Sequence, residues 1–208
     1  MNAENFLSKQ EQERIHQAVL EAESKTAGEI VPMIVASAAR YTEIEVLGLI
    51  GGLLIGMIVE FLWSDPWASA YINLWPVVGA FTGFFLCRLA AVKRVMAPTQ
   101  RMAEAVHALA LAEFTEQGLH DTRDHTGILI LVSLLEHRVE VLADRGISEK
   151  VEPGTWQEIV KTLTAGLKSK YACDAFCQAI ERCGEILAHH FPRQTDDPDE
   201  LPNRLVTK

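Results

Sequence analysis

The chain has 208 residues, of which 49% are hydrophobic, and a formal net charge of −9 at pH 7. This acidic balance would repel nucleic-acid phosphates, and no basic stripe interleaved with aromatic residues is present, so a nucleic-acid partner is excluded. The length is sufficient for one domain with a proper hydrophobic core in addition to membrane segments.

The first predicted elements are an amphipathic helix over residues 5–27 and a strand over residues 29–37. Ser8, followed by Glu11 three residues later, is typical of a helix N-cap, and Gly28 ends the helix. The N-terminal segment is acidic and polar, so we expect no cleaved signal peptide.

Two apolar runs follow, over residues 44–63 and 74–92. Each has about 20 residues, enough to span the roughly 30 Å hydrocarbon core of a bilayer as a helix. Residues 64–73 between them form only a short connection. The pattern predicts a two-helix transmembrane hairpin over residues 44–93, with a pair of buried core helices as the alternative.

The residues around the two runs predict which way the hairpin points. Aromatic residues gather at the connection, which lacks Lys and Arg: Trp63, Trp67, Tyr71 and Trp75. Basic residues gather at the opposite end: Arg40, Arg88, Lys93, Arg94 and Arg101. The positive-inside rule then predicts a two-span protein of the cell inner membrane with both termini in the cytoplasm.

Glycines recur every four residues along both apolar runs. They are Gly48, Gly52 and Gly56 in the first run, and Gly79 and Gly83 in the second. Such ridges of small residues let helix backbones approach closely. Two interpretations remain open: the ridges pack the two helices of one hairpin together, or they contact a membrane protein complex or a second copy of the chain.

The rest of the chain alternates helices and strands. A helix is predicted over residues 98–118, strands over 127–135 and 138–143, and helices from 153 and over 172–190, followed by an extended tail over 191–208. The order predicts an α/β protein: an α/β/α sandwich with a small mixed sheet and an inserted transmembrane hairpin. The sandwich is one discontinuous cytoplasmic domain, residues 1–43 with 94–190.

Several segments resemble the TPM-domain family, in a membrane-anchored form of bacterial type. They are Thr26–Ile30, Phe114 with Gly118–Leu119, Thr126–Ser133 and Glu136–Ile147. The family is named for thylakoid-lumen, photosystem-repair and receptor-modulating members. The resemblance implies an α/β/α sandwich and roles in assembly, repair or modulation of membrane complexes; phosphatase activity and calcium binding are attributed to some members.

Acidic side chains are predicted to meet where the two parallel strands begin. Of these, Glu29, Asp124 and Asp144 form a candidate metal site, because oxygen ligands of this kind suit calcium or magnesium. A solvated acidic rim is the alternative. We find no phosphate-binding loop, nucleophile elbow or Cys–His arrangement, so no catalytic residue is predicted.

Together these patterns predict a non-enzymatic accessory, assembly or modulatory factor of a membrane protein complex. The alternative is a divalent-metal-dependent phosphatase or a calcium-binding domain that uses the acidic residues.

Overall fold

The structure is a computed structural model that describes residues 3–63, 74–122, 124–152, 154–169, 171–193 and 204–208. The chain divides into two compact units. One comprises residues 1–38 and 103–208, and the other comprises residues 39–102. Each is described by itself.

The first unit is built on a four-stranded mixed sheet with the order β3-β2-β1-β4. β1 (Glu29–Val35) pairs in parallel with β2 (Gly127–Ser133), and β2 pairs antiparallel with β3 (Arg138–Ala143). β4 (Val206–Thr207) runs parallel to β1 on its other side. The prediction of an α/β fold with a small mixed sheet is confirmed.

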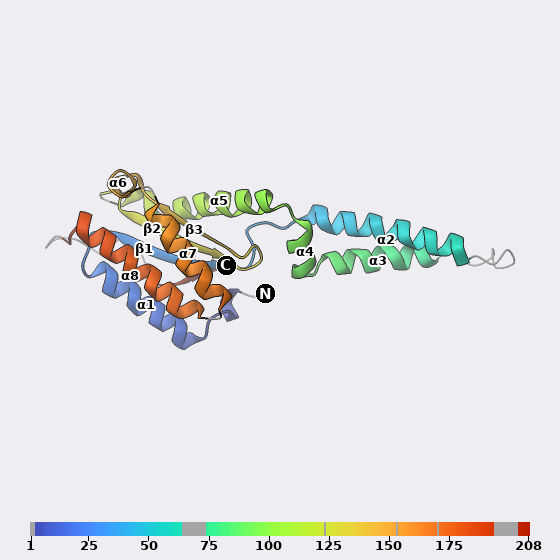
Figure 1. The fold of residues 1–208 in the computed structure, drawn as a ribbon, viewed down its shortest axis with the longest axis horizontal. Coiled ribbons are helices and arrows are strands. Elements are labelled where there is room, and N and C mark those ends of the chain that lie inside the picture. The colour runs from blue at the N-terminus through green and yellow to red at the C-terminus, as the bar shows by residue number, and fades with distance from the viewer. Residues whose placement is uncertain (1–2, 64–73, 123, 153, 170, 194–203) are drawn as a thin grey trace. The chain divides into compact units, whose positions relative to one another are not determined.

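One face of the sheet is covered by α1 (Lys9–Glu23), α7 (Thr155–Lys168) and α8 (Ala172–His190) (Figure 1). Ile30 of β1 and Ile128 of β2 are almost fully buried in this layer. The predicted cap of α1 is present, because Ser8 and Glu11 bond each other's backbone N–H groups.

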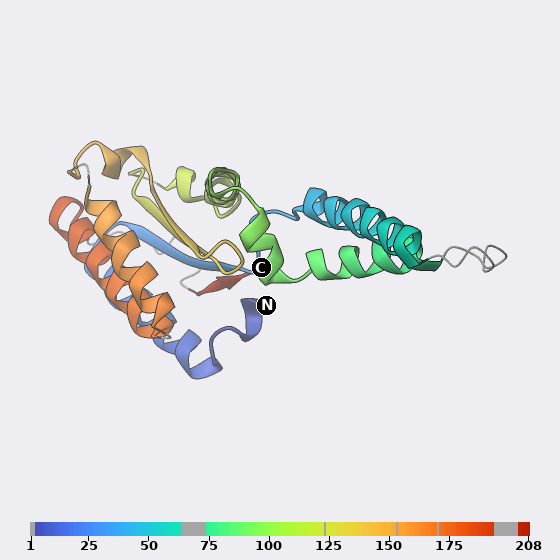
Figure 2. The same ribbon diagram turned by 45° about the vertical axis from the view of Figure 1, so that its right-hand side comes forward.

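The opposite face is covered by α5 (Thr99–Glu116) (Figure 2). Val106 of α5 packs against Val31 of β1 and Leu129 of β2, the strand residues that alternate with those of the first layer. Both faces of β1 and β2 are therefore buried, which explains their continuous apolar sequences.

Two local features of this unit differ from the sequence prediction. The end of the chain, predicted as an irregular extended tail, contains β4. A short helix, α6 (Arg145–Ser148), follows β3 where no element was predicted. Both are too short to leave a periodic signal in the sequence.

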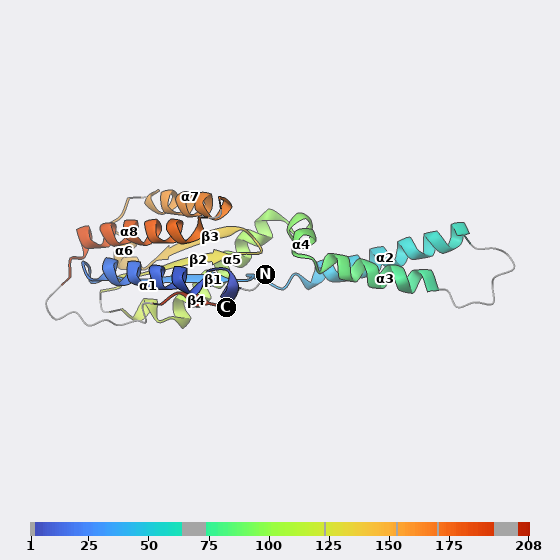
Figure 3. The ribbon, with the colours of Figure 1, turned by 90° about the horizontal axis from the view of Figure 1, so that it is seen from below.

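The second unit contains α2 (Thr42–Trp63), α3 (Leu74–Cys87) and α4 (Ala90–Met96). α2 and α3 lie side by side (Figure 3). Among the described residues, α2 is the one helix that is long and apolar enough by itself to cross a membrane. α3 and α4 qualify only if the two, bent by 85°, are counted as one span.

The predicted second span over residues 74–92 is therefore wrong as a single straight helix. It breaks after Cys87, directly before Arg88, the first of the basic residues at this end of the run. In α4, the Lys93 ammonium lies 2.6 Å from Glu45 Oε1 and donates to the Arg40 carbonyl at 3.2 Å. A straight helix would carry Lys93 away from these partners along its axis.

Candidate functional site

The predicted acidic residues surround the edge of the sheet where β1 and β2 begin. Glu29 pairs in register with Gly127, and the Asp144 N–H donates to the Gly127 carbonyl at 2.9 Å. Asp124 lies three residues before Gly127. Because β2 lies between β1 and β3, about 10 Å separates the backbones of Glu29 and Asp144.

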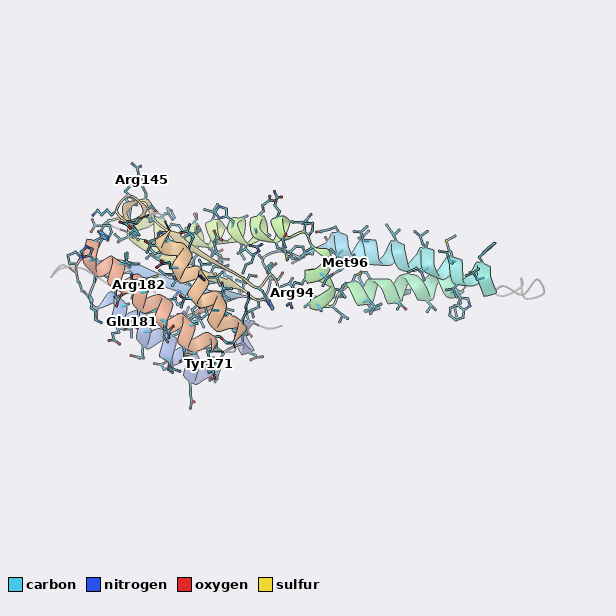
Figure 4. All side chains as sticks on the ribbon, viewed as in Figure 1. Arg94, Met96, Arg145, Tyr171, Glu181 and Arg182 are labelled. Atoms are coloured by element: carbon cyan, nitrogen blue, oxygen red, sulfur yellow. The ribbon has the colours of Figure 1, made fainter. Side chains whose placement is uncertain are left out.

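Asp144 is occupied by two local interactions. It is the N-cap of α6, where its Oδ1 accepts from the Arg145 N–H at 2.6 Å. Its Oδ2 lies 3.2 Å from His125 Nδ1. The Arg145 side chain extends outward from α6 (Figure 4) and its Nε donates to Glu149 at 2.9 Å. The carboxylate of Asp144 therefore stabilises the β3–α6 junction.

The loop that holds His125 is fitted closely against α6. His125 has a φ of 54°, in the left-handed region. A Cβ at Gly146 would lie 2.7 Å from the carbonyl oxygens of both Asp124 and His125. Glycine at position 146 therefore permits the loop to reach Asp144, a pairing that the sequence analysis missed.

Glu29 and Asp124 differ in their surroundings. Glu29 is buried, with 7% of its surface exposed, whereas Asp124 is exposed. Among the described residues, no three His, Cys, Asp or Glu side chains are grouped so that they could hold a metal ion. Calcium or magnesium binding by Glu29, Asp124 and Asp144 stays a prediction.

A buried carboxylate lies at the other end of β1 and β2. Glu136, in the turn between β2 and β3, accepts from the Ala38 N–H at 3.0 Å and from the Ser37 hydroxyl at 3.4 Å. It also accepts from the Ser133 hydroxyl. These bonds tie the turn to the segment that leaves β1. The sequence does not indicate the bonds from Ser37 and Ala38, because these residues lie 99 and 98 positions before Glu136 in the chain.

A second charged cluster joins the end of the chain to α5. Lys208 Nζ lies 2.8 and 3.0 Å from the two oxygens of Glu113 and 3.0 Å from Glu116 Oε1. Glu113, which also accepts from Gln117 at 3.4 Å, has only 4% of its surface exposed. Hydrogen bonds to Glu113 and then to Glu116 raise the pKa of Lys208. Sequence reasoning missed this cluster.

The predicted glycines of the hairpin face one another across α2 and α3. A Cβ on Gly52 would overlap the carbonyl oxygen of Gly79, and one on Gly83 would overlap that of Gly48. A Cβ on Gly56 would overlap the Trp75 carbonyl. In this structure the ridges are thus occupied by contacts within the hairpin.

The other sides of the hairpin expose large apolar side chains. On α2, 63% of Ile55 and 82% of Phe61 are exposed. Others exposed on these two helices include Leu47, Ile50, Leu54, Ile58, Val78, Phe81 and Phe85. Soluble monomeric proteins rarely expose a contiguous apolar surface of this extent.

Comparison with known proteins supports part of the sequence prediction. Residues 89–186 match the model of the family described as the TPM domain. No curated protein matches the chain. The NMR structure of BA42 protein from the psychrophilic bacterium Bizionia argentinensis has the same fold, with a TM-score of 0.62 and 20% identity over 99% of this chain and 97% of that one.

Proposed function

We propose that the chain is a membrane-anchored TPM-domain protein that acts as a non-enzymatic accessory, assembly or modulatory factor of a membrane protein complex. The first unit is a cytoplasmic α/β/α sandwich. The α2–α3 hairpin is a transmembrane anchor in the cell inner membrane, surrounded by lipid and in contact with the complex or with a second copy of the chain.

The observation that supports this proposal is the contrast between the inner and outer surfaces of the hairpin. Inside, the glycines bring two backbones together and leave no room for a side chain. Outside, Ile55, Phe61 and their neighbours are exposed. Lipid tails stabilise an apolar outer surface of this kind, whereas water does not. Close packing of two backbones through small residues is typical of helices that associate within a membrane.

The distribution of aromatic and basic residues supports the orientation. Trp75 lies in the first turn of α3, and the basic residues lie at the opposite end of the hairpin, where Lys93 and Arg94 belong to α4. Tryptophan favours the membrane interface, and Lys and Arg favour the cytoplasmic side. Both termini of the chain then lie in the cytoplasm.

Cysteine labelling tests this orientation. In a chain whose four native cysteines are replaced by serine, a Ser69→Cys variant should react with an impermeant maleimide in intact cells. An Asn203→Cys variant should react only after permeabilisation. Positions 69 and 203 lie outside the described residues. The reverse labelling pattern would refute the orientation, and a chain that washes from membranes at alkaline pH would refute the anchor.

Copurification in a mild detergent tests the accessory role. A membrane protein recovered at constant stoichiometry supports it. The alternative predicts a different result: hydrolysis of a phosphate monoester that needs magnesium or calcium and is abolished by Asp144→Asn. That result, in a variant whose melting temperature is unchanged, would replace the accessory role with a phosphatase.

A further inference from the structure

Among the described residues, the outer edge of β1 is paired with the segment 206–208. β4 contributes two register pairs, Met33 with Val206 and Ile34 with Thr207. The Lys208 N–H donates to the Ile34 carbonyl at 3.1 Å, and the Ala36 N–H donates to the Lys208 carbonyl at 3.0 Å. In the described part of the chain, β4 therefore pairs with this edge of the buried strand β1 over two residues.

The side chains of Leu205 and Val206 point to opposite faces of the sheet. Leu205 packs against the core formed with α1 and α8, and Val206 packs against the core formed with α5. Successive strand residues point to opposite faces, which explains this alternation. Lys208 then pairs with Glu113 and Glu116. The edge therefore accepts an extended segment with two apolar residues, one spacer and a lysine.

The charge arrangement makes this edge specific for a cation. The Glu113 side chain is 5% exposed, whereas the Lys208 side chain that neutralises it is 40% exposed. A buried carboxylate without its cation is strongly destabilising, so departure of Lys208 requires another cation in its place. By contrast, Leu205, Val206 and Thr207 are only partly buried, so little apolar contact holds the segment itself.

We propose that the β1 edge together with Glu113 and Glu116 is a binding site for an extended, lysine-containing segment of a partner protein, which adds as a strand in place of residues 204–208. Strand addition of this kind takes its affinity from backbone hydrogen bonds and its specificity from side-chain pockets. The inference rests on the proposed accessory role and specifies the sequence of the partner segment. This segment has two consecutive apolar residues, then one residue of any type, then a lysine.

Residues 204–208 act as a competitor within the same chain. A tethered segment has an effective concentration in the millimolar range, so a free peptide binds only weakly while the tethered one is intact. Weakening the Lys208 anchor should therefore expose the site to a peptide added in solution.

The experiment measures fluorescence anisotropy of a labelled Arg-Leu-Val-Thr-Lys peptide, amidated at its C-terminus, with the purified full chain. We expect the Lys208→Gln variant to bind this probe at least roughly 10-fold more tightly than the unmodified chain, since a charge-assisted anchor is lost from the competitor. Adding Glu113→Gln to that variant should weaken binding by roughly 10-fold or more. Glu149→Gln is the matched control, because it removes an exposed carboxylate that pairs with Arg145. This substitution should leave the affinity for the probe unchanged.

A matched probe that ends in glutamine instead of lysine should bind the Lys208→Gln variant roughly 10-fold more weakly. If the folded Lys208→Gln variant fails to bind the lysine probe, or binds both probes equally, the proposal is wrong. A concentration-dependent dimer of the unmodified chain that Lys208→Gln abolishes would assign the edge to a second copy and also overturn it.

Hydrogen exchange of the unmodified chain is a second measurement that needs no variant. The Ala36 amide, which bonds to the covering segment, should exchange much faster than the Leu131 amide in the central strand β2. Equal protection of the two amides would show that residues 204–208 are a permanent part of the sheet. Failure of these tests removes only this site, because copurification tests the accessory role separately.

Discussion

The contact between Gly52 and Gly79 makes a quantitative prediction about the hairpin. A Cβ at Gly52 would overlap the Gly79 carbonyl, whereas a Cβ at the adjacent Gly51 would meet nothing within 4 Å. Leucine at position 52 should therefore push α2 and α3 apart, and leucine at position 51 should not. Comparing the two variants cancels the change in helix propensity, since both replace glycine by leucine in the same helix.

Overpacking a close contact costs about 1–3 kcal/mol, so Gly52→Leu should be less stable than Gly51→Leu by that amount. This corresponds to a roughly 5- to 150-fold difference in the unfolding constant. The measurement is unfolding of the full chain by SDS from mild detergent micelles, followed by circular dichroism. Gly79→Leu should behave like Gly52→Leu, and the double variant should lose less than the sum, because the helices have already separated. Equal destabilisation by the substitutions at 51 and 52 would refute the packing.

Three further predictions concern the first unit. Asp144→Ala should lower the unfolding free energy by about 1 kcal/mol in denaturant titrations, since a helix cap is lost. The control Glu149→Ala, which removes an exposed ion pair, should cost less than about 1 kcal/mol. Equal losses in the two variants would contradict the capping role of Asp144. Glu136→Ala should cost about 2–3 kcal/mol in the same titration, because the bonds from Ala38, Ser37 and Ser133 go to a charged acceptor, and a loss as small as the Glu149→Ala loss would contradict it. Burial raises the pKa of Cys183 from 9.0 to about 12, so the native state keeps a proton that the unfolded chain releases, and stability should fall as the pH rises from 9.0 towards about 12. At pH 8 the more exposed Cys177 should be alkylated before Cys183 in a mass-spectrometric time course, and simultaneous alkylation would show that Cys183 is not buried.

Local sequence patterns determined most of the helices and strands. The unbroken apolar segment of β2 predicted a strand, and the chain order predicted the parallel pairing of β1 with β2 and the antiparallel return of β3. Capping by Ser8 and Glu11, and the glycine spacing of α2 and α3, were also readable. These features depend on residues within one or two turns of each other, so periodicity and capping chemistry are sufficient to recognise them.

The tertiary structure alone decided which distant groups meet. Asp144 was grouped in the sequence with other carboxylates, but its position after β3 places it against His125 and at the start of α6. Lys208 finds Glu113 only because β4 adds to the edge of β1 beside α5. Likewise, the second apolar run bends between α3 and α4, and Lys93 of α4 reaches Glu45, a partner 48 residues earlier in the chain. Composition and spacing describe what each segment can bury. They do not specify which charge or hydrogen-bond partner the folded backbone brings within 3 Å, because that distance is set by the packing of all the elements at once.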